Sequence, residues 1–562
     1  MPEPQRSVPR ALVWVGIVAL FFIAIAPTLS WLEFSGGMEN LNIATALELR
    51  RDHPDNWLIP TLEGKPRTKK PPLTAWITAW AIRPATVAAM SDGDPEVRAV
   101  AAKQLAWEVR WPSLLAACLM LVAVYELGRV VADPTVGVVA AIVGGATIMF
   151  LKFGRSAMID VHLGLWVTVA NVFLAHAILK GRRWTGCIGA AVALGLAFLI
   201  KGPVAWVQTL APVVLFVIVR RWRGDRDEHQ RKGVASWIGA ITLGVLVMCA
   251  IALPWYLYIL RTVPGAWEVW THEATDERGE KPSSILGYLA LLPYLLPWTV
   301  CFIGGIISAR RGVLLAVFLA VLPLVIMSFY KDRKERYMFP VTGAAAVVAA
   351  AGIVTLARKR DDWNGWDRAA VVQHWVLLVA IGLLLPAAAA TTRIPELTTV
   401  SHGPWISRAA GAMLTVGLGI VIAVAMLFRR QWLAALLSAT VIVMLAAHAV
   451  AIHGYAQTRA GLSEMRPLAN AIWQSHPDAL MYNAHPLEKR ASVDLSIYLN
   501  RVTTWVSAQE LAALTPAARP RVVVMLQNPK EPQPQAPAGW RFLYKVARDK
   551  DWWWAFVLEA KR

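Results

Sequence analysis

The sequence ALVWVGIVALFFIAIAPTLSWL occupies residues 11–32, and the polar stretch SGGMEN follows at residues 35–40. A transmembrane helix needs about 20 predominantly apolar residues. The apolar core of a signal peptide is shorter and precedes a cleavage site with small residues. This run is long for such a core and lacks a clear cleavage site. We therefore expect a retained helix that delivers residues 35–40 to a membrane surface.

Apolar runs of similar length recur along the chain. Of the 562 residues, 57% are apolar, and the mean hydropathy of +0.48 is high for a soluble protein. Hydropathy predicts about thirteen spans. They lie near residues 11–32, 111–132, 135–153, 161–179, 185–200, 203–219, 236–258, 285–307, 312–330, 340–357, 373–391, 408–428 and 432–453. The predicted fold class is a polytopic α-helical membrane protein.

The distribution of basic residues predicts the orientation of these spans. The net charge of +19 would suggest nucleic acid in a soluble protein, but cytoplasmic loops of membrane proteins carry excess Lys and Arg. With the N-terminus in the cytoplasm, the basic segments at 180–183, 220–232, 310–311, 358–360 and 429–430 nearly all face inward. We expect membrane lipids and no nucleic acid as partners. The four cysteines lie in apolar spans without metal-site spacing, so we expect no disulfide framework. No metal or other cofactor is evident from the sequence, and we expect none.

The composition changes after residue 454, where the long apolar runs end. Short patterns predict helices at 462–474, 492–499 and 508–514 and strands at 479–482, 502–506 and 521–526. We expect a transmembrane domain at residues 1–454 and a small α/β domain at 455–562 outside the cytoplasm. The run Trp552-Trp553-Trp554 suits packing or a membrane-facing edge better than catalysis.

The first outer loop, residues 33–110, has the strongest chemical pattern. We expect helices at 42–51 and 72–89, the second interrupted by Pro84, to lie on the membrane surface. Glu39 supplies a carboxylate at the start of the loop, and Arg67, Lys69 and Lys70 form a cationic cluster later in it. A carboxylate can accept a proton from an attacking hydroxyl, and cations can neutralise a phosphate. Pro71 and Pro72 stiffen the backbone after Lys70.

Other outer loops place polar residues at the same face. Asp160 starts an apolar helix, which favours function because an unused carboxylate at that depth is costly. Lys201 either snorkels to the interface or binds phosphate, and the Lys331–Arg336 run is either a solvated loop or part of the site. Further candidates for the substrate cavity are Tyr337, His272, Glu273 and Arg278. His272 has no second histidine at i+4, so a structural hydrogen bond is favoured over metal binding.

Several motifs occur in the order found in one family. The first loop contains Met38-Glu39, Ala46-Leu47-Glu48, Asp55-Asn56-Trp57, Pro60, Leu62-Glu63-Gly64-Lys65-Pro66 and Lys70-Pro71-Pro72. Later come Arg155 to Asp160, Leu199-Ile200-Lys201-Gly202-Pro203, Pro254-Trp255-Tyr256, Pro297-Trp298 and Arg336-Tyr337-Met338-Phe339-Pro340. In these residues the chain resembles the GT-C membrane glycosyltransferases, most closely the superfamily of protein O-mannosyltransferases and lipid A aminoarabinose transferases. The resemblance covers residues 11–350 well and the C-terminal part loosely.

The resemblance implies a bacterial inner-membrane glycosyltransferase with its site on the periplasmic side. The donor would be an undecaprenyl (polyprenyl) phosphate sugar and the acceptor lipid A or another envelope glycolipid. Glu39 and Asp160 would act as base or orient the acceptor, and Lys70, Arg67, Lys69, Arg336 and Lys201 would hold the donor phosphate. The family usually has Asp-Glu where this chain has Met38-Glu39. Either Glu39 replaces the missing aspartate, or the chain is inactive or uses a different acceptor.

Three alternatives remain open at this point. One is a protein O-glycosyltransferase of the same superfamily, and another is a lipid-binding relative without catalytic activity. The third is a transporter, which would place charged residues near the bilayer midplane and show internal repeats. The polar residues singled out above lie at span ends, and no repeat is evident.

Overall fold

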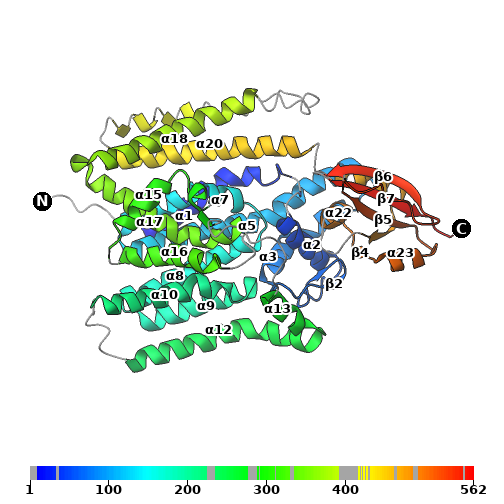
Figure 1. The fold of residues 1–562 in the computed structure, drawn as a ribbon, viewed down its shortest axis with the longest axis horizontal. Helices are drawn as coiled ribbons and strands as arrows, with labels where there is room; N and C mark the ends of the chain where they lie inside the picture. Colours follow the sequence, from blue (N-terminus) through cyan, green and yellow to red (C-terminus); the bar gives the residue numbers. More distant parts are fainter. Residues whose placement is uncertain are drawn as a thin grey trace.

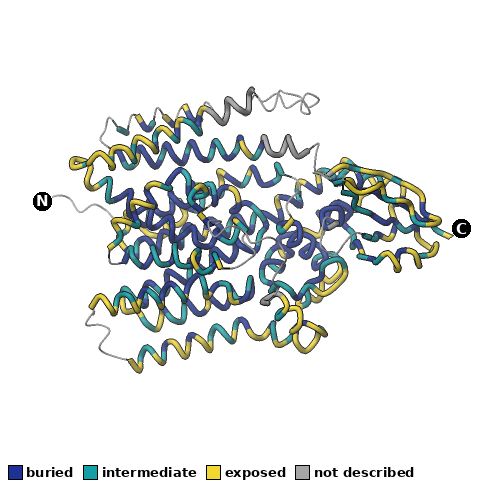
Figure 2. Tube along the Cα trace, viewed as in Figure 1, coloured by how far each residue is buried: buried dark blue, intermediate teal, exposed yellow. Residues whose placement is uncertain are grey.

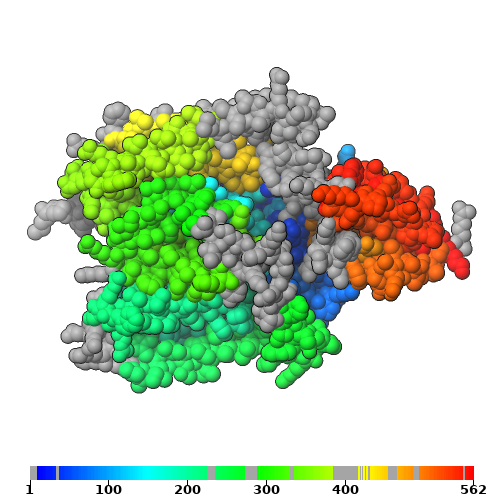
Figure 3. Space-filling model, viewed as in Figure 1, coloured from blue at the N-terminus to red at the C-terminus, as the bar shows by residue number. Residues whose placement is uncertain are grey.

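The structure is a computed structural model in which a long helical bundle carries a sheet-bearing lobe at one end (Figure 1). The lobe, formed by C-terminal residues, contains the end of the chain (Figure 3). The described residues are 9–32, 34, 37–224, 234–275, 288–289, 291–310, 312–329, 334–391, 415–417, 419–420, 422–424, 426–427, 431–460, 465–484, 492–528, 530–548 and 551–561.

The bundle and its outer loop contain most of the described helices. They are α1 (Arg10–Ile25), η1 (Ala26–Thr28), α2 (Gly37–Arg51), α3 (Leu73–Ala81), α4 (Pro84–Ala89), α5 (Pro95–Val131), α6 (Pro134–Gly145), α7 (Ile148–Phe153), α8 (Ile159–Leu179), α9 (Arg183–Lys201), α10 (Val204–Trp222), α12 (Val234–Thr262), α13 (Ala266–Thr275), α14 (Leu291–Tyr294), α15 (Thr299–Ile307), α16 (Gly312–Met327), η3 (Glu335–Val341), α17 (Thr342–Arg358), η4 (Arg360–Asp362), α18 (Gly365–Thr391) and α20 (Trp432–Ala460). A short hairpin in the outer loop pairs β1 (Thr61–Leu62) with β2 (Lys65–Pro66).

Eight segments within the described ranges are long and apolar enough to cross a membrane. They are α1 with η1, α5, α8, α9, α10, α12, η3 with α17, and α20. Shorter apolar helices include α6 and α16. The chain is thus a multi-pass membrane protein, as the sequence predicted. Parts of the predicted spans at 285–307 and 408–428 lie outside the described residues.

Burial differs sharply between the edge and the centre of the bundle. The helix α12 lies at one edge (Figure 1), and only 11% of its most apolar window is buried (Figure 2). The corresponding share for η3 with α17 is 89%. The alanines of α17 are small enough to let α15, α6 and α16 pack closely around it. The edge helix therefore presents an apolar face suited to lipid, and α17 is a core element.

The outer loop departs in two ways from the sequence prediction. The predicted span at 111–132 is the second part of α5, a 37-residue helix that begins in the loop, where Asp94 caps it by accepting from the Glu96 N–H. The predicted surface helix at 42–51 starts earlier, at Gly37, and residues 39–49 of α2 are all buried. It is enclosed because C-terminal residues pack over it (Figures 1 and 2). The interruption at Pro84 separates α3 from α4 as predicted.

The C-terminal part is built on a five-stranded sheet. Its elements are α21 (Arg466–Ser475), β3 (Leu480–Asn483), α22 (Ser492–Leu499), β4 (Thr503–Trp505), α23 (Ala508–Ala513), β5 (Arg521–Gln527), β6 (Arg541–Arg548) and β7 (Asp551–Leu558). The strand order is β4-β3-β5-β7-β6, in which β3 runs parallel to β4 and β5, and β7 runs antiparallel to β5 and β6. The sequence did not predict β6 and β7. Trp553 and Trp554 are buried in β7, so this run serves packing.

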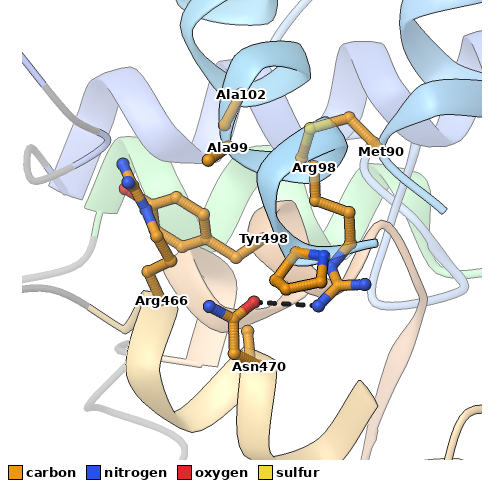
Figure 4. Close-up of a pocket in the computed structure, with 9 residues that line it drawn as sticks. Met90, Arg98, Ala99, Ala102, Arg466, Asn470 and Tyr498 are labelled. Atoms are coloured by element: carbon orange, nitrogen blue, oxygen red, sulfur yellow. Dashed lines mark hydrogen bonds between the residues drawn. The ribbon is translucent and has the colours of Figure 1, made fainter. Parts of the chain in front are cut away.

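The outer loop and the C-terminal part share one apolar core. It joins Phe34 and Leu47 to Leu468, Val522 and Trp553, among others. Arg98 of α5 reinforces the junction, since its Nη2 donates to Asn470 Oδ1 at 3.1 Å beside Arg466 and Tyr498 (Figure 4). The cavity there measures about 10 Å³, room for roughly one water. This junction is a packed interface and cannot hold a substrate. The proposed division at residues 454 and 455 stays a prediction.

The close approach of α15 to α17 gives a stability test. A Cβ added at Gly305 would lie 2.1 Å from the carbonyl oxygen of Val348, whereas one at the adjacent Gly304 would meet nothing within 4 Å. We expect Gly305→Ala to lower the free energy of unfolding by about 1–3 kcal/mol through overpacking. Gly304→Ala should leave stability unchanged or raise it slightly. Thermal unfolding of both purified variants is the measurement, and equal melting temperatures would contradict the packing described here.

Candidate active site

A carboxylate flanked by two cations lies where several helices end. Asp160 is 4% exposed in the first turn of α8. Lys201 Nζ donates to its Oδ1, and Arg336 Nε lies 3.3 Å from its Oδ2. The side chains of Lys201 and Arg336 keep 12% and 16% of their surface exposed. The three groups form the Asp160 cluster, which is sheltered but can be reached from solvent.

Local structure explains why these side chains meet. Lys201 is the last residue of α9, and Gly202 turns the chain with φ +66° and ψ −146°, a conformation that favours glycine. Arg336 and Tyr337 lie in the 3₁₀ turn η3 that leads into α17. The Tyr337 ring is 3.9 Å from Lys201 Nζ and 5.0 Å from the Arg336 guanidinium carbon. The tyrosine thus fixes both cations beside Asp160.

The cationic part of the outer loop approaches the same cluster. Lys70 is half-buried and near enough for its charge to act on Lys201. Tryptophan side chains hold this part of the loop in place. Trp255 Nε1 donates to Leu58 O at 2.9 Å, and Trp270 Nε1 donates to Thr68 O at 2.9 Å. Lys70, Lys201 and Arg336 together with Asp160 carry a net charge of +2, which suits a phosphate.

Glu39 lies in a second, more deeply buried cluster. Its oxygens accept from Arg110 Nε at 2.8 Å and Nη2 at 3.1 Å, and Oε1 also accepts from the Ala157 N–H at 2.9 Å. The Glu39 and Arg110 side chains are only 8% and 2% exposed. Burial alone would raise the pKa of Glu39, but the Arg110 guanidinium, the Ala157 N–H and nearby Arg155 outweigh it and hold that pKa below its usual value.

Arg110 and Asn40 extend this cluster to two other parts of the chain. Arg110 Nη1 donates to Leu29 O at 2.7 Å and Leu32 O at 2.6 Å, which ties α5 to the end of the first span. Asn40 Nδ2 donates to Asp494 Oδ1 on α22, which ties α2 to the C-terminal part. Because both carboxylate oxygens of Glu39 already have hydrogen-bond partners, the geometry favours a role in positioning other groups. A role of Glu39 as the general base stays a prediction.

The remaining predicted residues divide into three groups. Arg67 Nη1 donates to Thr45 Oγ1 at 3.0 Å, so its guanidinium contacts α2. Lys69 is half-buried beside Lys70, and His272 is exposed on α13. Glu273 belongs to α13, but its side chain lies outside the described residues, as does all of Arg278. In the part of the chain that is described, no three His, Cys, Asp or Glu side chains gather as metal ligands would.

Sequence reasoning missed some polar partners at this face. Arg110 stands directly before an apolar span, and a cation in that position is a usable sequence signal of a buried partner, which the structure shows to be Glu39. Asp494 gave no signal, because its partner Asn40 lies 454 positions away. Met38, at the position of the family aspartate, is half-buried and packs against the core shared with the C-terminal part. No proton acceptor therefore stands at that position.

Comparison with known proteins gives matches to one superfamily. The model of the dolichyl-phosphate-mannose-protein mannosyltransferase family matches residues 98–259. An undecaprenyl phosphate-alpha-4-amino-4-deoxy-L-arabinose arabinosyl transferase 2 of Proteus mirabilis is 25% identical over 267 residues, and a related transferase of Yersinia pestis is 24% identical over 260. These alignments cover 45% and 43% of this chain. They cover 46% and 45% of the relatives, so the chain matches about half of their length.

Solved structures match over nearly the whole chain. The crystal structure of ArnT from Cupriavidus metallidurans in the apo state aligns with a TM-score of 0.73 and 19% identity, covering 99% of this chain and 100% of that one. The same protein bound to undecaprenyl phosphate gives a TM-score of 0.70 and 19% identity, with 98% and 99% covered. At this identity the likeness shows the fold, which is that of the GT-C membrane enzymes. The fold and the resemblance predicted from the sequence are confirmed.

The buried Glu39 pair makes stability depend on pH. The pKa of Glu39 is lower in the folded protein than in the unfolded chain, where it is taken as 4.5. The ion pair therefore contributes its full stabilisation above pH 4.5. That contribution is lost as the pH falls through the pKa of Glu39 in the folded protein. We expect Glu39→Gln to cost about 3–5 kcal/mol near neutral pH, the usual effect of breaking a buried pair. The difference in melting temperature between parent and variant should shrink as the pH falls below about 4.5. A constant difference across that range would exclude this account of the pair.

Proposed function

We propose that the chain is a membrane glycosyltransferase of the GT-C superfamily, and that it transfers a sugar from a polyprenyl phosphate donor to an envelope acceptor. The donor lipid is undecaprenyl phosphate, and the acceptor is lipid A or another glycolipid. The reaction takes place at the outer face of the bacterial inner membrane, so the active site and the C-terminal part are periplasmic.

The Asp160 cluster with Lys70 is the observation that supports this proposal most strongly. A polyprenyl phosphate has an apolar tail and an anionic head, and it needs cations at the depth where apolar helices end. Lys201 ends α9, Asp160 begins α8, and Arg336 precedes α17. The net charge of +2 matches a phosphate that gains negative charge as the sugar leaves. Such stabilisation of developing charge is worth several kcal/mol in a sheltered site.

The chemistry assigned to each residue follows from this arrangement. The acceptor oxygen forms a bond to the anomeric carbon as the bond from that carbon to the phosphate oxygen breaks. The bonding electron pair departs on the phosphate oxygen, where Lys70, Lys201 and Arg336 stabilise the charge. Asp160 orients Lys201 and Arg336, and its Oδ2 is the more weakly engaged oxygen, at 3.3 Å from Arg336. That oxygen can accept the proton of an acceptor hydroxyl.

In this proposal Glu39 is a positioning residue. Through the Ala157 N–H it fixes the turn that leads from α7 into α8, and Asp160 follows three residues later. The predicted assignment of Glu39 as the proton acceptor remains open to test. Arg67 and Lys69 take supporting roles in holding the cationic loop.

A second candidate function is lipid binding without catalysis, and Met38 is the observation that favours it. A thioether cannot accept a proton, and this one packs in the core. The two candidates share a donor site and differ in turnover. If the protein binds undecaprenyl phosphate but transfers no sugar from any donor, the non-catalytic candidate is the correct one. A protein O-glycosyltransferase differs from the main proposal only in its acceptor.

Loss of one cation should weaken use of the donor. We expect Lys70→Ala to reduce sugar transfer about 10- to 150-fold, because a hydrogen bond to a charged group contributes about 1.5–3 kcal/mol. Asp160→Asn should remove transfer more completely than Glu39→Gln, once each rate is corrected for the folded fraction. Single-turnover transfer from a radiolabelled donor in membranes is the measurement. The control is Lys103→Ala, which removes a lysine from α5 instead of from the cationic part of the loop. Unchanged transfer by Lys70→Ala would exclude its role.

The proposed sidedness has an independent test. A cysteine placed at Gln533 should react with a membrane-impermeant thiol reagent added to intact spheroplasts, whereas one at Gly224 should react only after the membrane is opened. Gln533 lies in the C-terminal part, and Gly224 follows the basic end of α10. The reverse labelling pattern would place the cluster on the cytoplasmic side and overturn the proposed periplasmic reaction.

A further inference from the structure

A second group of polar side chains lies outside the Asp160 cluster. Lys152 lies in the last turn of α7, Tyr294 ends α14, and Glu335 begins η3, so three separate elements contribute. Lys152 Nζ lies 2.9 Å from Glu335 Oε2 and donates to the Tyr294 hydroxyl at 2.7 Å. The Tyr294 hydroxyl in turn donates to Glu335 Oε2. We call these three residues the Lys152 triad.

The exposure of the triad argues against a purely structural role. The Lys152 and Glu335 side chains are 48% and 54% exposed. Ion pairs at such exposure add little to stability, because solvent screens them and ordering two long side chains costs entropy. By contrast, the Glu39 and Arg110 pair is only 8% and 2% exposed. The triad therefore keeps charged groups accessible at a face where a substrate head group would lie.

Chain geometry places the triad beside the proposed phosphate site. Glu335 and Arg336 are consecutive, so their Cα atoms are about 3.8 Å apart. On the other side, the turn at residues 154–158 separates Lys152 from Asp160. A sugar joined to a phosphate held by Arg336 and Lys201 must lie within one ring's length of that phosphate. This connection along the chain is the geometric basis for placing the sugar beside the triad.

The triad offers the chemistry that a sugar ring needs. Carboxylate oxygens accept hydrogen bonds from hydroxyl groups, and an ammonium donates to hydroxyl oxygens. Aromatic rings border these polar groups, because Lys152 Nζ lies 5.0 Å from the ring centroids of both Phe153 and Tyr294. Those two rings are 6.1 Å apart. An apolar surface beside paired donors and acceptors suits a ring with one apolar face and hydroxyl groups at its edge.

We propose that the Lys152 triad is the sugar subsite and that it selects a neutral, hydroxyl-bearing sugar. This inference rests on the proposed donor function. Lys152 and Glu335 compensate each other's charge, so the triad has no net charge to offer an ionised sugar. A sugar with an ammonium group would also lie near Lys152, Lys201 and Arg336, and their like charges oppose it. The subsite therefore disfavours an amino sugar and accepts an uncharged one such as mannose.

The test compares lipids that differ only in the sugar. Binding of undecaprenyl phosphate, undecaprenyl phosphate mannose and the aminoarabinose-linked lipid is measured on the full-length protein in nanodiscs. The parent should bind the mannose-linked lipid most tightly. Glu335→Gln should weaken binding of that lipid about tenfold or more, as expected for the loss of a hydrogen bond to a charged group. Tyr294→Phe should weaken it about 2- to 10-fold, because its hydroxyl is neutral. Binding of undecaprenyl phosphate itself should not weaken in either variant, because the cations of the phosphate site are untouched.

Two controls separate the possible failures. Glu559→Gln removes a carboxylate of similar exposure, 52%, in the C-terminal part and should leave all three affinities unchanged. Tyr294→Phe removes only a hydroxyl group, so it keeps the test valid if Glu335→Gln folds poorly. The proposed subsite would be wrong if both triad variants bound the mannose-linked lipid as tightly as the parent does. It would also be wrong if the parent preferred the aminoarabinose-linked lipid. If the parent binds none of the three lipids, the protein does not use such a donor, and both the proposed function and the proposed sugar subsite are wrong.

Discussion

The ion pair between Glu39 and Arg110 is the constraint on which the arrangement of charged residues at this end of the helical bundle depends. Arg110 also donates to two carbonyl oxygens at the end of the first span, and Glu39 accepts from the Ala157 N–H. Three parts of the chain, residues 29–39, Arg110 and Ala157, thus meet at two buried charges. A buried pair is costly to break, because the remaining charge would be left without compensation. The position of the turn before α8, and hence of Asp160, follows from this pair.

Two kinds of charged cluster at this face have different physical roles. The Glu39 pair is closed, with every carboxylate oxygen engaged, and it defines geometry. The Asp160 cluster and the Lys152 triad keep exposed surface and hold charge where a lipid head group would enter. One cluster has the excess positive charge that a phosphate requires, and the other is balanced, as a neutral sugar requires. Under the proposed function, this division would let one face bind both parts of a lipid-linked sugar.

Hydropathy and motif order were enough to predict the helical membrane fold, the outer-loop helices and several C-terminal elements. Asp160, Lys201 and Arg336 were each singled out from the sequence, but their mutual contact was visible only in the structure. The burial of α2 could not be predicted, because its second face is covered by residues more than 400 positions later. The strands β6 and β7 were missed because an antiparallel pair rich in tryptophan resembles a packing segment. Glu335 was assigned to a loop and Lys152 to the end of the predicted span at 135–153, and only the tertiary structure joins them to Tyr294.

The central claim is that the Asp160 cluster binds the phosphate of a polyprenyl donor. It is tested most directly by an electron cryomicroscopy map of the protein in nanodiscs with undecaprenyl phosphate. We expect phosphate density about 3 Å from Lys201 Nζ and the Arg336 guanidinium, the distance of a charge-assisted hydrogen bond. Lys201 should then turn from Asp160 toward the phosphate. Lipid density elsewhere on the protein, with the contact between Lys201 and Asp160 unchanged, would contradict the account.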